Sequence, residues 1–202
     1  MYYSQSNQDK WVCEKLNYKH NGYYVDVGAY DGIQTSNTFI FEKEYSWQGI
    51  CIEANPLIFK KLCSNRNSIN INIAVDDKSG ECFFDNDKIS LTNSGFLVKK
   101  NTLNQILIQN KCNSNIDYLS LDIEGNEFVA LNSLDFNLWN IKLITVEHNL
   151  YLNGPENKNK IFDLLTNKNF ERIVDNALCL DKNPLWHNKP YEDWYINKNI
   201  IL

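Results

Sequence analysis

Carboxylate side chains lie at the ends of several short apolar runs in this 202-residue chain. Glu53, Asp122 and Glu147 each occupy such a position. In an open α/β sheet, ligands bind at the carboxyl ends of the strands, near the point where the strand order reverses. If the apolar runs are neighbouring strands, we expect these carboxylates to line one ligand-binding cleft.

A turn containing two glycines, over Asp26–Gly32, follows the first apolar run. Glycine lets the backbone approach a ligand closely. Tyr30 and Ile33 stand where the dinucleotide fingerprint G-x-G-x-x-G requires glycine, so the turn disfavours NAD and FAD. An acid at the strand end, Asp26, suits a ligand with a cationic amine, such as the methionine part of S-adenosylmethionine. Taken alone, the motif leaves an ordinary strand-to-helix turn equally open.

Two further strand ends could complete a nucleoside site. Glu53 lies 25 residues beyond Gly28, where a carboxylate can accept hydrogen bonds from both hydroxyls of a ribose. After the third run, Ala74, Val75 and Asp76 could hold an adenine ring and its amino group. A solvated acid is the alternative for Glu53, and an acidic surface turn is the alternative for the third site.

The fourth and fifth strand ends carry the candidates for catalysis. Strand alternation puts Asp122 and Glu124 on the same side, and paired carboxylates are costly unless they bind a cation, a polar ligand or a proton. Glu124 also suits the N-terminus of the next helix. We expect His148 or Asp122 to act as a general base, with Glu124 beside them. The rival arrangement is Mg²⁺ or Mn²⁺ held by Asp122 with Glu124 or Glu147.

The apolar runs alternate with segments of helical spacing, which predicts a mostly parallel sheet with helices. Strands are expected at 23–27, 47–52, 70–75, 117–122 and 143–147, a hairpin arm at 80–84, and a final short pair at 170–174 and 178–180. Helices are expected from Ser36 to Lys43, from Pro56, and over 103–109, 127–134 and 161–166. Residues 90–95 and 149–160 are expected to be mobile loops. The aromatic C-terminal segment 186–195 could stack on a sugar, although packing onto the sheet is the favoured interpretation.

The composition favours one globular domain over residues 1–202, although the chain could be excised from a longer protein. A net charge of -5 with scattered basic residues argues against tracking of nucleic acid. No run is apolar enough for a signal peptide or a membrane span. The six cysteines form no C-x-x-C pair and are interpreted as free thiols in a reducing, cytoplasmic compartment. The oligomeric state is not indicated.

Taken together, four strings resemble the FkbM family of methyltransferases. They are Val25–Gly32, Cys51–Pro56, Asp122–Gly125 and Glu147–Asn149, and the opening Ser4–Asp9 is also similar to that of many members. The resemblance implies a class I methyltransferase fold, with a seven-stranded mostly parallel sheet, one antiparallel strand and helices on both faces. It also implies S-adenosylmethionine as the methyl donor, S-adenosylhomocysteine as the product, and mostly O-methylation.

Carried over onto this sequence, the resemblance assigns the donor loop to Asp26, Gly28 and Gly32, and the ribose-binding acid to Glu53. Asp122 and Glu124 match the family's signature after the fourth strand, whereas Tyr30 departs from the small polar residue that members usually carry. The complete expected donor site is Asp26, Gly28, Ala29, Tyr30, Gly32, Glu53, Ala54, Ala74, Val75, Asp76 and Asp122.

The expected function is therefore O-methylation of a hydroxyl on a sugar, a glycan or a similar small polar acceptor. A non-catalytic module that binds S-adenosylmethionine or a nucleotide is the alternative from another class. It would keep Gly28 and Glu53 but would not need Asp122, Glu124 and His148. An O- or N-methyltransferase of a non-sugar small molecule also remains open. Neither a nucleic acid nor a membrane is expected as a partner.

Overall fold

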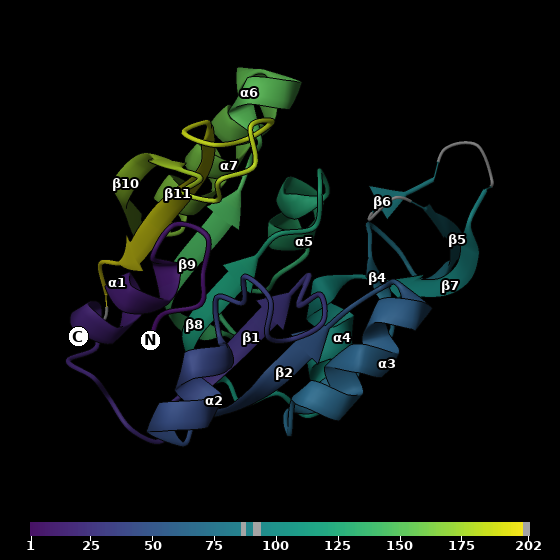
Figure 1. Ribbon diagram of the computed structural model, residues 1–202, viewed down its shortest axis with the longest axis horizontal. Helices are drawn as coiled ribbons and strands as arrows, with labels where there is room; N and C mark the ends of the chain where they lie inside the picture. The colour runs from purple at the N-terminus through teal and green to yellow at the C-terminus, as the bar shows by residue number, and fades with distance from the viewer. Residues whose placement is uncertain (86–87, 91–93, 200–202) are drawn as a thin grey trace.

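The computed structural model describes residues 1–85, 88–90 and 94–199, and its centre is a seven-stranded sheet (Figure 1). The strands are β1 (Tyr23–Val27), β2 (Gln48–Ile52), β3 (Ile69–Ile71), β8 (Asn115–Leu121), β9 (Asn140–Glu147), β10 (Phe170–Leu178) and β11 (Pro190–Asn197). Their order is β10-β11-β9-β8-β1-β2-β3. Only β11 runs antiparallel to its neighbours, β9 and β10, within this sheet. The predicted fold class is confirmed.

Helices cover both faces of this sheet, because alternate side chains of each central strand are buried on opposite sides. Val25 and Val27 belong to one core, and Tyr24 between them belongs to the other. The first core is closed by α4 (Leu103–Gln109), α5 (Glu127–Asn132) and α7 (Pro155–Asn167), and the second by α1 (Gln8–Lys15), α2 (Phe39–Tyr45) and α3 (Pro56–Asn65). A short helix, α6 (Leu150–Asn153), follows the end of β9.

The strand order reverses between β1 and β8, and one glycine makes their close approach possible. Gly28 directly follows β1 with φ of +88°, a conformation that L side chains rarely adopt. A Cβ atom on Gly28 would lie 1.7 Å from the carbonyl oxygen of Asp122, directly after β8. The glycine of the expected donor loop is therefore required by the packing of the two strand ends.

Local signals explain where the helices begin. The side chain of Asn55 accepts hydrogen bonds from the backbone N–H groups of Leu57 and Ile58, and Pro56 opens α3 as expected. The helix expected from Ser36 begins instead at Phe39, because the preceding residues form a turn. The Oγ atom of Ser36 still accepts from the N–H of Phe39 at 3.1 Å, so it caps the helix from outside.

The run expected as one strand over 70–75 is divided between two sheets. β3 ends at Ile71, and β4 (Ala74–Val75) joins a second sheet with the order β4-β7-β5-β6. The chain leaves the first sheet at Asn72, whose Nδ2 atom donates to the carbonyl groups of Glu53 and Ala54. The other strands are β5 (Gly80–Asp85), which confirms the predicted arm, β6 (Lys88–Ile89) and β7 (Phe96–Asn101). Of the expected loop 90–95, residues 91–93 lie outside the described residues.

The C-terminal region differs most from expectation. The predicted short pair at 170–174 and 178–180 is wrong, because β10 continues through an irregularity at Asn176 and pairs with β11 instead. Tyr191, Trp194 and Tyr195 are buried in β11, which confirms the interpretation that this tail packs into the sheet. The segment 149–160 is mostly helical rather than a loop. Across the described ranges, no helix combines the length and apolar character needed to cross a membrane.

Candidate functional site

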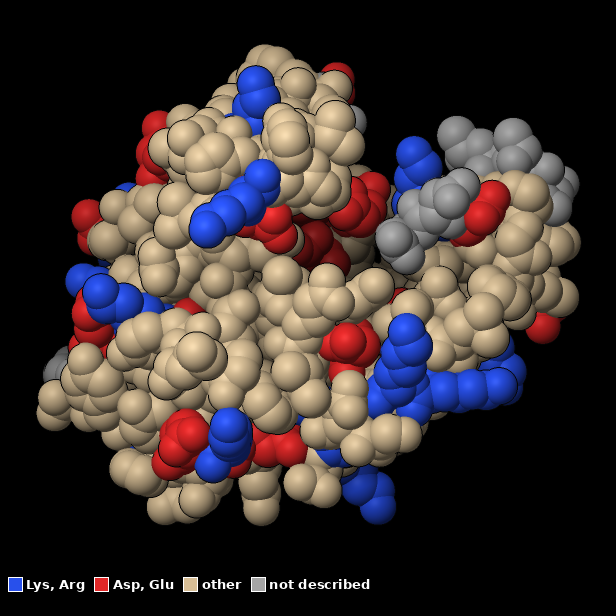
Figure 2. All heavy atoms as spheres, viewed as in Figure 1, with Lys and Arg blue, Asp and Glu red and all other residues tan. Residues whose placement is uncertain are grey.

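A cavity of about 690 Å³ opens at the carboxyl ends of β1, β2, β8 and β9. Figure 2 shows it as a hollow with acidic side chains at its floor. The predicted residues that line it are Asp26, Gly28, Ala29, Tyr30, Glu53, Ala54, Ala74, Val75, Asp76, Asp122, Glu124 and Glu147. Its volume is within the range of small-molecule and cofactor sites. The structure thus brings most of the predicted site residues into one cleft.

Gly32 and His148 do not line this cavity. The carbonyl of Gly32 accepts from Nη1 of Arg66 at 3.1 Å. His148 is only 1% exposed. Its Nε2 atom lies 3.2 Å from Oδ1 of Asp193, and its Nδ1 atom accepts from the N–H of Leu150 at 3.1 Å. Both ring nitrogens of His148 are therefore engaged behind the cleft, and the geometry does not support His148 as the general base.

Glu53 is held rigidly at the end of β2. Its two carboxylate oxygens accept from the backbone N–H groups of Tyr30 at 3.0 Å and Asn55 at 2.7 Å. Tyr30 has φ of 49°, and this left-handed conformation lets the loop after β1 pass beside Glu53. Carboxylate oxygens have lone pairs for further donors. Glu53 can therefore bind two ribose hydroxyls without first reorganising.

Asp26 lies deeper in the cleft and is tied to the turn before α2. Its Oδ2 atom accepts from Oγ1 of Thr38 at 2.5 Å. Burial raises its pKa. On the same turn, Asn37 donates to Oγ of Ser120 at 3.0 Å, while its buried Oδ1 atom accepts no hydrogen bond from the described part of the chain. Asn37 and Ser120 both line the cavity and can receive a cationic amine or a hydroxyl beside Asp26.

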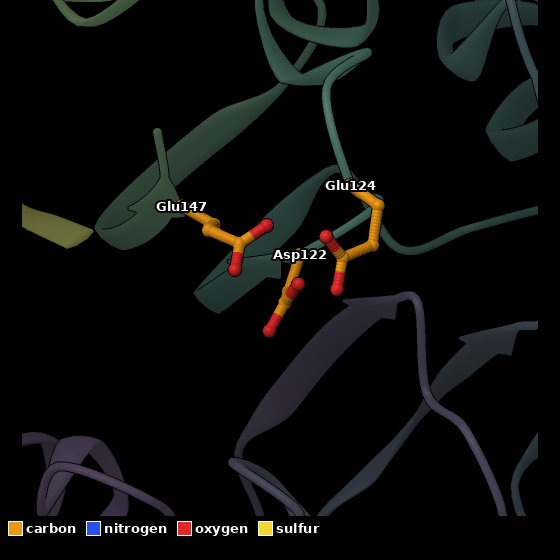
Figure 3. A group of neighbouring side chains, drawn as sticks. All are labelled: Asp122, Glu124 and Glu147. Carbon is orange, nitrogen blue, oxygen red and sulfur yellow. The ribbon is translucent and has the colours of Figure 1, made fainter. Parts of the chain in front are cut away.

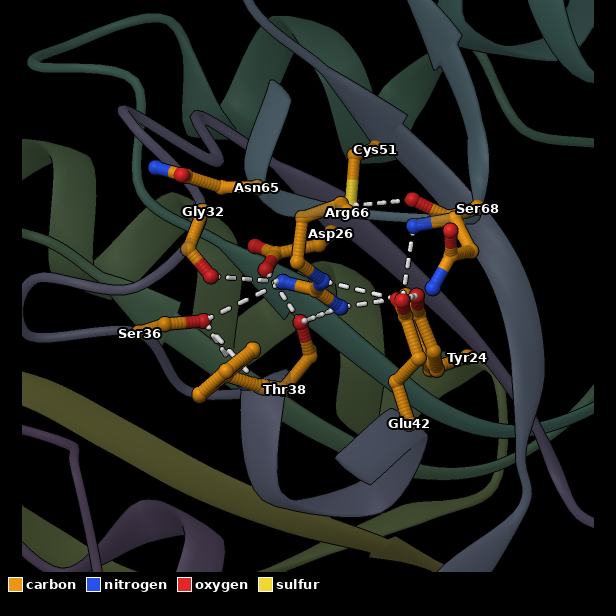
Figure 4. A network of polar contacts seen from close by, with 12 residues as sticks. Tyr24, Asp26, Gly32, Ser36, Thr38, Glu42, Cys51, Asn65, Arg66 and Ser68 are labelled. Atoms are coloured by element: carbon orange, nitrogen blue, oxygen red, sulfur yellow. Dashed lines mark hydrogen bonds and ion pairs between the residues drawn. The ribbon is translucent and has the colours of Figure 1, made fainter. Parts of the chain in front are cut away.

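Arg66, at the end of α3, fixes this turn from behind (Figure 4). Its side chain is 0% exposed, and its guanidinium donates to the carbonyl of Gly32, to Oγ of Ser36 and to Oγ1 of Thr38. Its Nε atom pairs with Glu42 at 2.8 Å. A buried guanidinium is tolerated only when its donors are satisfied. No local pattern in the sequence indicates this role, because the partners lie 24 to 34 residues away.

The adenine site expected around Ala74, Val75 and Asp76 forms one wall of the cleft. The Oδ2 atom of Asp76 is paired with the ammonium group of Lys100 at 2.5 Å. The carbonyl of Val75 accepts from Nδ2 of Asn126 at 3.1 Å. The apolar side chains in this wall can contact a ring, whereas the carboxylate of Asp76 is already neutralised by Lys100.

Three carboxylates converge at the ends of β8 and β9 (Figure 3). One oxygen each of Asp122, Glu124 and Glu147 lies within 4.8 Å of the others. Burial and the charge of Glu124 raise the pKa of Asp122 to about 7. Burial and the charge of Asp122 raise the pKa of Glu147. The buried Oε2 atom of Glu147 accepts no hydrogen bond from any described residue. Such a group can share a proton or hold a cation.

Glu124 joins this group through an unusual backbone conformation. Its φ is 57°, and Gly125 follows with φ of 120°. A non-glycine residue in this region costs about 1–3 kcal/mol. The turn brings Glu124 back toward Asp122, and Nδ2 of Asn149 lies 3.4 Å from Oε2 of Glu124. Neighbouring Tyr151 and Trp186 line the same end of the cavity.

The fold and the cleft together define the class of protein. The strand order and the single antiparallel strand match the fold of solved class I methyltransferases, and the cleft lies at the point where the strand order reverses. The family model described as "Methyltransferase FkbM domain" matches residues 26–172, which is more than half of the chain. The chain belongs to this family, and the predicted resemblance is confirmed.

Solved structures support the fold at low sequence identity. Methyltransferase FkbM from Methylobacillus flagellatus KT matches with a TM-score of 0.56 and 12% identity, covering 87% of this chain and 43% of that one. The present chain therefore spans less than half of that protein. Precorrin-6y C5,15-methyltransferase from Geobacter metallireducens GS-15 matches with a TM-score of 0.52 and 12% identity, over 93% and 87% of the two chains.

A third likeness is to Aeropyrum pernix fibrillarin, crystallised with S-adenosyl-L-methionine. The TM-score is 0.52 at 10% identity, and the match covers 88% of this chain and 67% of that one. Among curated proteins, none matches this chain. The structural likenesses establish the fold, and the family model establishes the family.

Proposed function

We propose that this protein transfers the methyl group of S-adenosylmethionine to a hydroxyl of a sugar, a glycan or a similar small polar acceptor. One observation carries the proposal. The same cavity is lined by Glu53 and the glycine turn at one end and by the carboxylates of Asp122, Glu124 and Glu147 at the other. A donor site and a proton-accepting site therefore share one cleft. A module that only binds a nucleotide would need the first end alone.

Different residues bind the donor and remove the proton of the acceptor. Glu53 holds the ribose, and Asn37 with Asp26 receives the amine of the methionine part. The bound donor supplies a methyl group that is already activated by its positive sulfur, so alignment of the acceptor can contribute roughly 7–11 kcal/mol. Asp122 takes the proton of the acceptor hydroxyl as the new oxygen–carbon bond forms. The electron pair of the broken sulfur–carbon bond stays on sulfur, which leaves a neutral thioether.

The chemistry of the acceptor end supports a sugar. Tyr151 and Trp186 supply aromatic surface, and Asn149 and Asp181 supply polar groups in the same part of the cavity. Aromatic faces pack against the C–H faces of sugars, while amide and carboxylate groups bind their hydroxyls. Trp186 lines the cavity, whereas the buried aromatic residues of the C-terminal segment belong to β11.

The composition of the chain also bears on its partners and its compartment. We propose a small-molecule or glycan acceptor rather than a nucleic acid, which is supported by the net charge of -5 and the acidic cavity. We also propose a reducing, cytoplasmic compartment, which is supported by six free cysteines.

The donor site is tested by calorimetric titration with S-adenosylhomocysteine. We expect the wild-type protein to bind it and Glu53→Ala to weaken binding by roughly 10- to 100-fold, because a hydrogen-bonded charged group contributes about 1.5–3 kcal/mol. Glu44→Ala is the matched control, since that carboxylate is 53% exposed and lies outside the cavity. Absence of binding by the wild-type protein would reject the proposal.

The acceptor end is tested by Asp122→Asn in a screen of sugar and glycan acceptors with labelled donor. Removal of a general base costs about 10²- to 10⁴-fold in turnover. We expect that loss in kcat, with the affinity for S-adenosylhomocysteine within about threefold of wild type. A variant that loses donor binding instead would show that Asp122 belongs to the donor site.

A further inference from the structure

The charges that line the cavity are unbalanced. Among the described lining residues, the carboxylates are Asp26, Glu53, Asp76, Asp122, Glu124, Glu147 and Asp181, and the only basic side chain is Lys88. Asp76 is neutralised by Lys100 and Asp26 lies beside the guanidinium of Arg66. S-adenosylmethionine brings a net charge of only +1. Of the five other carboxylates, three form the cluster of Asp122, Glu124 and Glu147.

The geometry of this carboxylate cluster is that of a set of oxygen ligands. The three oxygens lie within 4.8 Å of one another. Glu147 ends β9 and Asp122 directly follows β8, so the sheet holds these two residues, and the turn at Glu124 brings in the third. Figure 3 shows the three side chains pointing toward one another. Hard divalent cations such as Mg²⁺ and Mn²⁺ are bound through carboxylate oxygens together with water and substrate.

The Oε2 atom of Glu147 is an independent sign of a ligand. Glu147 is 5% exposed, and this oxygen is buried without a donor from any part of the chain that the structure describes. A buried polar atom without a partner is costly, and such atoms are rare in folded proteins. By contrast, both oxygens of the nearby buried Glu127 accept hydrogen bonds, from Ile123, Gly125 and Asn157. The carboxyl group of Glu147 also contacts that of Asp122, and a cation in the cluster would supply the partner that the Oε2 atom lacks.

We propose that Asp122, Glu124 and Glu147 hold one Mg²⁺ or Mn²⁺ ion, which also binds the acceptor hydroxyl. This inference rests on the proposed function and adds a metal to it. The charge of the ion favours the ionised hydroxyl, and the proton still passes to an oxygen of Asp122 that does not bind the metal. The ion also fixes the position of the acceptor oxygen, which the aromatic groups of Tyr151 and Trp186 alone cannot do.

The test measures the binding of Mn²⁺ to the protein saturated with S-adenosylhomocysteine. Electron paramagnetic resonance and calorimetry detect the binding. We expect one site per chain and competition by Mg²⁺. Glu147→Gln should weaken Mn²⁺ binding by about tenfold or more, since even residues that only support metal ligands cost 10- to 100-fold. The affinity of this variant for S-adenosylhomocysteine should stay within about twofold of that of the wild-type protein, which verifies that the variant is folded. If Glu147→Gln does not fold, Glu124→Gln replaces it, because Glu124 is exposed.

Glu192→Gln is the matched control. Glu192 is a buried acid that pairs across the strands with Glu147 but lies outside the cavity, so its replacement should leave Mn²⁺ binding unchanged. Binding of S-adenosylhomocysteine without any binding of Mn²⁺ at millimolar concentration would overturn the metal site and leave the proposed function intact. Equal binding of Mn²⁺ by the wild-type protein and Glu147→Gln would also overturn it. Failure of S-adenosylhomocysteine itself to bind would reject the proposed function instead.

Discussion

The two ends of the cavity contain the same kind of side chain in opposite electrostatic situations. At the proposed donor end, Glu53 accepts two backbone hydrogen bonds and Asp26 accepts one from Thr38. At the proposed acceptor end, burial and neighbouring carboxylates raise the pKa of Asp122 and that of Glu147, and one oxygen of Glu147 has no donor within the described ranges. The donor end is organised before any ligand binds. The acceptor end is completed only by a proton, a cation or a substrate.

The strongest way to break this division is Gly28→Ala, because Gly28 lies where the two ends meet. The new Cβ atom would collide with the backbone of Asp122 at 1.7 Å, at a φ of +88°. We expect a loss of about 3 kcal/mol in the free energy of unfolding, together with loss of S-adenosylhomocysteine binding. Denaturant unfolding and calorimetry measure the two effects.

Gly125→Ala separates backbone strain from collision. Gly125 has φ of +120°, but a Cβ atom there would meet nothing within 4 Å. This variant should lose stability only through strain and should keep donor binding. Equal loss of donor binding in both variants would show that the contact between Gly28 and Asp122 is not what separates the two ends.

A second variant acts on the donor end alone. Arg66→Met leaves Glu42 without its buried partner and releases the turn of Ser36 and Thr38, so we expect about 3 kcal/mol of destabilisation. The affinity for S-adenosylhomocysteine should fall with it. Arg172→Met is the control, because Arg172 pairs with Asp193 on the far side of the sheet from this turn. Both variants should lose stability, but Arg66→Met alone should lose donor affinity. Retained affinity would contradict a positioning role for Arg66.

The smallest expected effect is on the pH dependence of stability, and it concerns Glu192, which lies beside the proposed acceptor end. Burial raises the pKa of Glu192 to about 8 from its usual value of 4.5. A carboxyl group with a raised pKa binds its proton more tightly in the folded state, so its contribution to stability is present at low pH and is lost as the pH rises through 8. Between pH 6 and 8 this amounts to up to about 2 kcal/mol.

Glu192→Gln should remove the contribution of Glu192 to the pH dependence of the free energy of unfolding. Gln8 donates to Glu192 in the folded protein, and an amide oxygen can still accept this hydrogen bond. Denaturant unfolding at several pH values compares the two proteins. An unchanged slope in Glu192→Gln would show that other buried acids, such as those of the acceptor end, carry the pH dependence.

Much of the cleft could be predicted from the sequence, because its residues lie at strand ends that local patterns reveal. Short apolar runs predict β1, β2, β8 and β9, and the rule that ligands bind at the carboxyl ends of strands predicts that Glu53 and Asp122 lie together. His148 was grouped with them by position alone. Its side chain points to the other side of the strand end, toward Asp193, and one residue of offset decides the side.

Features that depend on distant partners could not be predicted. Arg66 has no local pattern that distinguishes it from a surface arginine, and Asn37 reaches the cleft only through a turn before α2. The division between β3 and β4 was also hidden, because residues 69–75, in which Ile alternates with Asn before Ala74 and Val75, have the pattern of one strand. The bend at Asn72 is stabilised by carbonyl groups of Glu53 and Ala54, which lie almost twenty residues earlier.

The second sheet enters and leaves the main fold at adjacent points, because β4 pairs with β7 and places Val75 opposite Asn101. It has a small core of its own around Phe84 and Val98, and it contributes Lys88 to the wall of the cavity. A segment whose ends already meet can be lengthened, shortened or exchanged with little cost to the domain that carries it. The part of the chain between β4 and β7 is therefore a replaceable cassette, which can change in length or sequence while the seven-stranded sheet stays as it is.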